Sequence, residues 1–141
     1  MPHIKAVMTP FPYSADADAR IDQAQAFMRQ HHIRHLPCTD KGQLVGMLSD
    51  RDIKLVLGPD FAYPQARDLL VRDVMVKDPY VVDLEARLDD VLMHMADRQL
   101  GSVIVTREGK LAGVFTVTDA CRGFAEFLRD QVRRSGGDTA A

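Results

Sequence analysis

The sequence has little that would cross-link, anchor or export a protein. It contains no tryptophan and only two cysteines among 141 residues, and no apolar run is long enough to span a bilayer. Cys38 and Cys121 lack the paired spacing of a metal or redox motif, so we expect free, buried thiols rather than a disulfide. The first residues also lack the apolar run of a signal peptide. We therefore expect a cytoplasmic protein without a membrane anchor.

An excess of one charge is also missing. The sequence has 18 Lys and Arg against 20 Asp and Glu, which gives a formal net charge of −2 at pH 7. Such a balance provides no general attraction to nucleic acid or to an anionic membrane. Three arginines near the C-terminus, Arg129, Arg133 and Arg134, are interpreted as the solvated face of a last helix. Neither nucleic acid nor a membrane is an expected partner.

Recognisable catalytic motifs are absent too. The sequence has no Gly-x-Ser-x-Gly elbow, no Walker loop and no His-Glu-x-x-His. His31, His32 and His35 lie close together, but no cysteine or carboxylate completes a metal-binding spacing beside them. We predict no enzyme, no metal site and no cofactor.

What the sequence does contain is an internal repeat with a period of 67 residues. The segment GMLSDRD at 46–52 returns as GVFTVTD at 113–119. Further pairs hold the same register without a gap, among them Val7-Met8 with Val74-Met75 and Pro12-Tyr13 with Pro79-Tyr80. A period this long, present twice, indicates a duplicated half rather than an open-ended array.

Each copy predicts two helices. The apolar residues from Leu88 to Met95 follow the i, i+3, i+4, i+7 spacing of one helix face, and the first copy repeats most of that stripe. Asp16 and Asp83 are the expected N-caps of these first helices. A second helix is expected to begin after the hydroxyl residue of each repeated segment.

Short apolar runs between the helices predict strands. They cover residues 36–39 and 44–48 in one copy and 102–106 and 111–115 in the other, and a glycine turn joins each pair as a hairpin. One copy therefore has the order β-α-β-β-α. Since about fifty residues bury a poor core, we predict one α/β (α+β) globule in which two pseudo-symmetric copies pack sheet to sheet. The expected boundaries are 4–57 and 71–134, with a linker at 58–70 and a disordered tail at 135–141.

The repeated segment has two chemical interpretations. Ser49 with Asp52, and Thr116 with Asp119, have the spacing of a capping box, in which the side chains satisfy backbone groups at the start of a helix. The same junction also suits a ligand, because the first N–H groups of a helix favour a phosphate and a carboxylate beside them can accept hydrogen bonds from ribose hydroxyls. Both interpretations stay open at this point.

The duplicated motifs together resemble a known family. The Val-Met pair near the start, Arg34-His35-Leu36-Pro37, the glycine hairpin and Gly-x-x-Ser/Thr-x-x-Asp occur in an order similar to a tandem pair of cystathionine β-synthase (CBS) domains, the Bateman module. The resemblance covers roughly residues 4 to 130. It implies a regulatory module with two clefts that bind AMP, ADP, ATP or S-adenosylmethionine, and it implies a homodimer that modulates another, unidentified protein.

By position, the resemblance also implies which residues touch the ligand. Asp52 and Asp119 would hold ribose hydroxyls, and Arg51 and Thr118 would face phosphates. The full set of implied contacts is Thr9, Arg34, His35, Pro37, Ser49, Arg51, Asp52, Lys77, Ser102, Ile104, Thr116, Thr118 and Asp119.

The two copies differ where the charge of the clefts is set. Arg34-His35 becomes Gly101-Ser102, and the family's usual Thr-Pro, here Thr9-Pro10, becomes Val76-Lys77. The first copy brings Arg34 and Arg51, whose guanidinium groups suit phosphate oxygens. We expect clefts of unequal charge, and whether one or both of them hold a ligand stays open at this point.

Three classes of function are therefore compared. The first is an adenine-nucleotide sensor, and we expect this one. The second is a ligand-independent dimerisation or interaction module, and the third is a small hydrolase or other enzyme that depends on Asp52 or Asp119.

Overall fold

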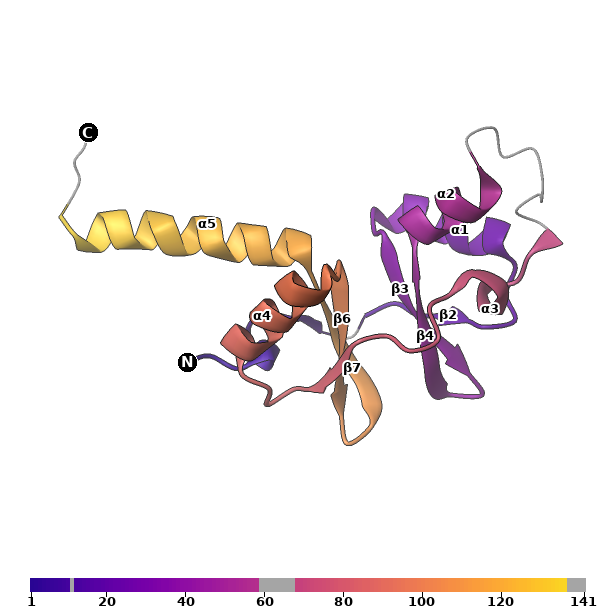
Figure 1. Cartoon of the computed structure of the whole chain (residues 1–141), viewed down its shortest axis with the longest axis horizontal. Coiled ribbons are helices and arrows are strands. Elements are labelled where there is room, and N and C mark those ends of the chain that lie inside the picture. Colours follow the sequence, from indigo (N-terminus) through magenta and orange to yellow (C-terminus); the bar gives the residue numbers. More distant parts are fainter. Residues whose placement is uncertain (11, 59–67, 137–141) are drawn as a thin grey trace.

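The computed structural model describes residues 1–10, 12–58 and 68–136 and contains the predicted repeat (Figure 1). The elements of the first copy are β2 (Ala15–Asp16), α1 (Ile21–His31), β3 (His35–Asp40), β4 (Gln43–Ser49) and α2 (Asp50–Leu57). Those of the second copy are β5 (Val81–Asp83), α4 (Leu88–Arg98), β6 (Ser102–Arg107), β7 (Lys110–Thr116) and α5 (Val117–Arg134). Both copies thus have the order β-α-β-β-α, which confirms the predicted fold.

Three short elements precede or join the copies. They are η1 (Ile4–Ala6), β1 (Thr9–Pro10) and α3 (Val71–Val74). Residues 59–67, most of the predicted linker, lie outside the described residues, as do residues 137–141 of the predicted tail. Of that tail, Ser135 caps α5 and its hydroxyl donates to the carbonyl oxygen of Val132 at 3.0 Å.

The strands form two small sheets that match one another. In each copy a short strand runs parallel to the first strand of a hairpin, as β2 does beside β3 and β5 beside β6. The hairpins β3–β4 and β6–β7 are antiparallel. Their turns carry Gly42 and Gly109 at φ values of 79° and 80°, the conformation for which glycine is suited. The glycine turns of the sequence analysis are confirmed.

The prediction that Asp16 and Asp83 are the N-caps of the first helices was wrong, because the N-caps are Arg20 and Arg87. Asp16 and Asp83 end β2 and β5, and the first helices begin only at Ile21 and Leu88. The two carboxylates instead accept hydrogen bonds from the backbone N–H two residues on, at 2.8 and 2.9 Å. This is the local turn that aspartate side chains favour outside helices, so the residue type was informative but the element was not the one expected.

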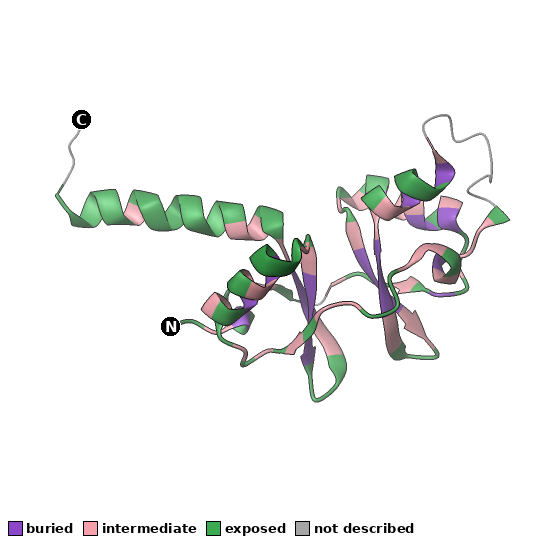
Figure 2. Cartoon of the chain, viewed as in Figure 1, coloured by how far each residue is buried: buried purple, intermediate pink, exposed green. Residues whose placement is uncertain are grey.

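The hydrophobic core has three parts, and the purple strands at the centre of Figure 2 show where they meet. Each copy packs its first helix and hairpin around its own cluster, one containing Ile21 and Leu48 and the other Val91 and Phe115. A third cluster of Met47, Ile104 and Val114 lies between the two sheets. The copies therefore pack sheet to sheet, as predicted.

The segment that precedes each copy packs on the opposite copy. Ile4 is 0% exposed and belongs to the core of the second copy, whereas Val71, 67 residues further on, is 0% exposed in the core of the first. The backbone repeats the exchange, because Ile4 N–H donates to Ala86 and Val71 N–H donates to Ala19, both at 2.8 Å. β1 likewise pairs with β7 of the other copy. Neither copy completes its core without the other.

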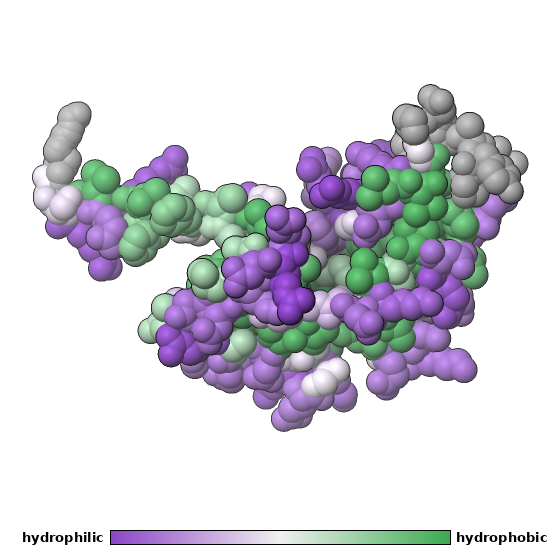
Figure 3. All heavy atoms as spheres, viewed as in Figure 1, coloured by the Kyte–Doolittle hydropathy of each residue, from purple (hydrophilic) through white to green (hydrophobic). Residues whose placement is uncertain are grey.

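The last helix departs from the compact body. α5 has 18 residues, none of them buried, and projects beyond α4 (Figures 1 and 2). Its exposed apolar residues are Val117, Phe124, Phe127, Leu128 and Val132. Figure 3 shows hydrophobic side chains along the side of this helix that faces the viewer.

Candidate functional site

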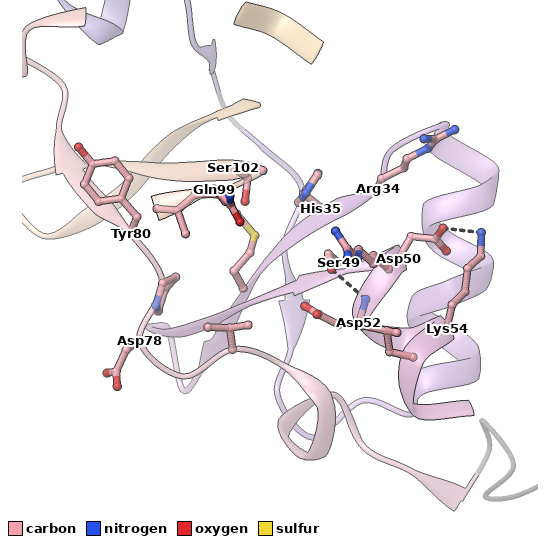
Figure 4. Close-up of a pocket in the computed structure, with 17 residues that line it drawn as sticks. Arg34, His35, Ser49, Asp50, Asp52, Lys54, Asp78, Tyr80, Gln99 and Ser102 are labelled. Atoms are coloured by element: carbon pink, nitrogen blue, oxygen red, sulfur yellow. Dashed lines mark hydrogen bonds and ion pairs between the residues drawn. The ribbon is translucent and has the colours of Figure 1, made fainter. Parts of the chain in front are cut away.

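A cavity of about 860 Å³ lies between the two copies (Figure 4), a volume in the range of small-molecule sites. We call it the main cavity. The first copy lines it from the start of β3, the end of β4 and the first turns of α2, and the second copy lines it from the segments before β5 and β6. Its lining residues are Arg34, His35, Met47, Ser49, Asp50, Arg51, Asp52, Lys54 and Leu55 from one side and Val76, Asp78, Pro79, Tyr80, Gln99, Leu100, Gly101 and Ser102 from the other.

The start of α2 places a hydroxyl and a carboxylate at this cavity. The Ser49 hydroxyl accepts a hydrogen bond from the backbone N–H of Asp52 at 3.0 Å and so caps the helix. The Asp52 carboxylate does not return the bond, and among the described residues it accepts no hydrogen bond and forms no ion pair. Figure 4 shows it on the side of α2 that faces the cavity, away from Lys54. It is therefore available to a ligand.

The equivalent carboxylate in the second copy is occupied by its own helix. Asp119 accepts from the backbone N–H of Thr116 at 2.9 Å and from the Thr116 hydroxyl at 3.1 Å. Its own N–H donates back to the Thr116 oxygen at 3.2 Å, which completes a capping box. An ion pair with Arg122 at 3.7 Å adds to these bonds. The capping interpretation is thus confirmed for Asp119.

His35 lies near enough to both carboxylates for their charges to act on it. Burial lowers the pKa of its imidazole below the ordinary 6.5, and nearby Arg34 lowers it further, whereas Asp52 and Asp119 act to raise it. A Cβ at Gly101 would lie 3.5 Å from His35 Nε2, an ordinary van der Waals contact. Gly101 of the second copy and His35 of the first are therefore close neighbours across the cavity.

Charged residues of both signs line the main cavity, and only some of them form ion pairs. Lys54 Nζ lies 2.9 Å from Asp50 Oδ2, an exposed pair of small energetic value. Arg34 and Arg51 form no ion pair with any residue that the structure describes. Two arginines that line the same cavity as a free carboxylate suit a ligand that has both hydroxyl groups and phosphate.

Six of the thirteen predicted contact residues meet at the main cavity. They are Arg34, His35, Ser49, Arg51, Asp52 and Ser102. The others do not line it: Pro37 and Ile104 are buried in β3 and β6, Thr9 and Lys77 are exposed on β1 and before β5, and Thr116, Thr118 and Asp119 start α5.

Sequence reasoning missed the apolar wall of the cavity. Met47, Leu55, Val76 and Leu100 line it together with the pair Pro79-Tyr80. Tyr80 stacks on His94 with ring centroids 4.1 Å apart, and burial raises the pKa of its hydroxyl. A signal for this pair was present, since Pro79-Tyr80 repeats Pro12-Tyr13 at the common period, but repetition alone did not indicate a site.

The described residues give little basis for a metal site, a membrane span or a reactive thiol. Across the described residues, no group of three or more His, Cys, Asp and Glu side chains is placed to hold a metal ion. No described helix combines the length and apolar character needed to cross a bilayer. Cys38 is buried, and burial raises the pKa of its thiol to about 12, so it is a packing residue rather than a nucleophile. Cys121 is exposed, which corrects the prediction of two buried thiols.

Comparison with known proteins gives one family. The family model of the CBS domain matches residues 4–58 and again 71–126. Hypoxic response protein 1 of Mycobacterium tuberculosis is 37% identical over 107 residues, which cover 73% of this chain and 71% of that protein.

Two solved structures share the fold. The CBS domain pair of protein MJ0100, in complex with 5′-methylthioadenosine and S-adenosyl-L-methionine, has a TM-score of 0.79 at 23% identity and covers 89% of this chain and 98% of its own. CBSX2 in complex with AMP has a TM-score of 0.76 at 22% identity, covering 90% and 98%.

Proposed function

Because the chain belongs to the CBS domain family, we propose that its main cavity binds an adenine nucleotide or adenosine derivative and that binding changes its affinity for a partner protein. AMP, ADP, ATP and S-adenosylmethionine are the candidate ligands. The relatives MJ0100 and CBSX2, whose structures hold adenosine compounds, support this ligand class. The module acts as a sensor rather than an enzyme, and it works in the cytoplasm.

One observation carries the proposal: the Asp52 carboxylate faces the main cavity with no partner among the described residues. A carboxylate in this state can accept hydrogen bonds from both hydroxyls of a ribose. Met47, Val76 and Leu100 add an apolar surface against which a flat base can pack, and Arg34 and Arg51 provide positive charge for a phosphate. The site at Asp52 is then the functional one, and the cleft expected at Asp119 is the weaker or the lost one.

Regulation further requires that the ligand bind two states of the protein unequally. The cavity is built from both copies, so a ligand that fills it contacts the first copy through Asp52 and the second through Tyr80 and Ser102. It can therefore stabilise one relative position of the copies over another. A partner protein that reads this position is the regulated target.

Calorimetry on two matched variants tests the site. Asp52→Ala removes charge-assisted hydrogen bonds to the ribose and is expected to weaken binding of the tightest ligand by about ten- to a hundredfold. Asp119→Ala changes the matching residue of the second copy and is expected to leave that affinity within about threefold, since a capping residue acts mainly on stability. Equal affinity in wild type and Asp52→Ala, with both folded by circular dichroism, would refute the site. If none of the four ligands binds the wild type, the proposed function is refuted.

A second function is favoured by a separate observation. The apolar residues of α5 are exposed, among them Phe124 at 61% and Val132 at 58%. The first helices offer a homodimer little apolar surface, since among the described residues α1 has no exposed large apolar residue and α4 has only Met93. A ligand-independent homodimer through α5 is the alternative role. A stable dimer stays associated at about fifty micromolar. Sedimentation of the wild type as a monomer at that concentration would therefore rule out the homodimer.

A further inference from the structure

A second, smaller hollow adjoins the main cavity. It has a volume of about 380 Å³ and lies between the end of α1 and the start of α2. We call it the basic groove, after its lining residues Arg29, His32, Arg34 and Lys54; Gln25, Met28, Ile33 and Asp50 complete it. Arg34, Asp50 and Lys54 also line the main cavity, so the two spaces are neighbours that share one wall.

The groove holds more positive charge than its own carboxylate balances. Asp50 is its one acidic lining residue, and this carboxylate is already paired with Lys54 at 2.9 Å. Arg29 and Arg34 form no ion pair with any described residue. In Figure 4, Arg34 extends away from Tyr80, on the side of the main cavity where Asp50 and Lys54 of α2 lie. The basic groove therefore has two guanidinium groups without an ion pair among the described residues, and that of Arg34 also lines the main cavity.

The second copy shows that the fold does not need these charges. At the equivalent positions, 67 residues on, Arg29 becomes Ala96, His32 becomes Gln99, Arg34 becomes Gly101 and Lys54 becomes Cys121. The backbone at the end of the first helix is nevertheless the same, since His32 and Gln99 both end their helices at a φ of 55°. The cations are specific to the copy whose aspartate is free, which indicates a ligand rather than a structural role.

We propose that the basic groove holds the terminal phosphates of a nucleoside triphosphate whose nucleoside part occupies the main cavity. The inference rests on the proposed function and narrows its ligand class from any adenosine compound to a triphosphate. Arg34 lines both spaces and would contact the triphosphate where it passes from the main cavity into the groove. Arg29 and His32 line the groove alone and would contact only the terminal phosphates. A monophosphate is too short to use them.

Titration calorimetry with AMP and ATP tests this assignment on wild type, Arg29→Ala and His32→Gln. Gln is the residue that the second copy carries at the equivalent backbone position, so His32→Gln preserves the fold. Wild type is expected to bind ATP about tenfold more tightly than AMP, the effect of one charge-assisted hydrogen bond at a partly exposed site. Arg29→Ala is expected to reduce ATP affinity about fivefold and to leave AMP affinity unchanged.

Arg98→Ala is the matched control. Arg98 lies in the last turn of α4 as Arg29 lies in the last turn of α1, is likewise exposed, and lines neither hollow. Arg98→Ala should change neither the AMP affinity nor the ATP affinity. If it weakens ATP binding as much as Arg29→Ala does, the effect comes from the net charge of the protein, and the assignment of the basic groove is wrong.

Three further outcomes separate the inference from the function on which it rests. AMP and ATP bound equally tightly, or Arg29→Ala weakening both alike, would overturn the groove while the main cavity keeps its role. If inorganic triphosphate binds the wild type as tightly as ATP does, the groove is a general anion site, and the proposal that one nucleotide spans both spaces is wrong. No binding of AMP or ATP at all would overturn the proposed function together with the inference.

Discussion

The two copies begin their second helix with the same motif and use its carboxylate differently. In the second copy Asp119 closes a capping box on Thr116, whereas in the first copy Asp52 leaves the cap to Ser49 and faces the main cavity. Sequence offered a cap and a ligand contact as alternatives for both residues. The structure shows that one motif can serve the fold in one copy and leave a free carboxylate in the other.

The surroundings of the two carboxylates differ in the same direction. Arg34 and Arg51 flank the free aspartate, and the uncharged Gly101 and Thr118 take their places in the second copy. Duplication of the fold has therefore not preserved duplication of the site. The predictions below test how far the two copies are equivalent, from the largest expected effect to the smallest.

The largest effect is expected from the exchanged core residues. Ile4→Ala should lower the free energy of unfolding by about 2 to 5 kcal/mol, because the side chain is fully buried in the core of the other copy. Val71→Ala should lower it by less, since fewer methyl groups are removed from the equivalent place. Urea denaturation measures both. The exposed Met1→Ala is the control and should stay within about 0.5 kcal/mol of wild type, and a similarly small change in Ile4→Ala would show that the exchange does not hold the copies together.

The next effect concerns the glycine that opens each motif. A Cβ at Gly46 would lie 2.7 Å from the backbone oxygen of Val76, whereas at Gly113 the nearest backbone atom, the Thr9 oxygen, lies at 3.0 Å. Gly46→Ala should therefore destabilise by about 1 to 3 kcal/mol and Gly113→Ala by less. Thermal and urea unfolding decide between them. Gly123→Ala in α5, where a Cβ meets nothing within 4 Å, should instead stabilise by about 0.5 to 1 kcal/mol; the same gain in Gly46→Ala would contradict the close approach.

A smaller effect distinguishes the caps. Asp119→Ala should lower the free energy of unfolding by about 1 kcal/mol because it removes the capping box, and Asp52→Ala should lower it by less, since that carboxylate makes no capping bond. Unfolding in the absence of ligand measures the difference. Thr116→Ala breaks the same box, so Thr116→Ala combined with Asp119→Ala should fall short of additivity. A larger loss in Asp52→Ala than in Asp119→Ala would reverse the comparison.

The smallest effect is a pH dependence confined to the first copy. The folded pKa of His35 is lowered below 6.5, mainly by burial and also by Arg34, although Asp52 and Asp119 oppose the shift. Between the lowered pKa and 6.5 the unfolded chain binds more protons, so stability is complete above 6.5 and falls as the pH drops through that window. His35→Ser installs the residue of the second copy, Ser102, and should lose less stability between pH 7 and 5 in urea unfolding; an unchanged pH slope would contradict the assignment.

Sequence reasoning predicted the parts of the molecule that repeat in the chain. The period of 67 residues and the alternation within each copy were enough for the element order, the hairpins and the packing of sheet on sheet. The first helices began later than expected, because Asp16 and Asp83 made local turns with the backbone two residues on. Periodicity predicts which segments are helical better than it predicts where an aspartate directs its oxygen atoms.

The site was predicted less completely for a physical reason. Its charged half comes from adjacent positions of one copy, such as Ser49 and Asp52, and sequence spacing can show this. Part of its apolar wall comes from Tyr80 and Leu100 of the second copy, which reach it only because the copies face each other. The exchange of Ile4 and Val71 also had no local signal, since either residue would suit the core of its own copy equally well.

That exchange has a practical consequence for anyone who divides the chain. A peptide of residues 1–58 carries Ile4 but lacks the valine that fills its own core, and a peptide of residues 68–141 carries Val71 but lacks the isoleucine that fills its own. Each peptide thus carries the side chain that fills the core of the other, and its own core has an unfilled position. Two separately produced fragments are therefore expected to recover the fold only when mixed, and substitutions at Ile4 or Val71 are expected to adjust how tightly they associate.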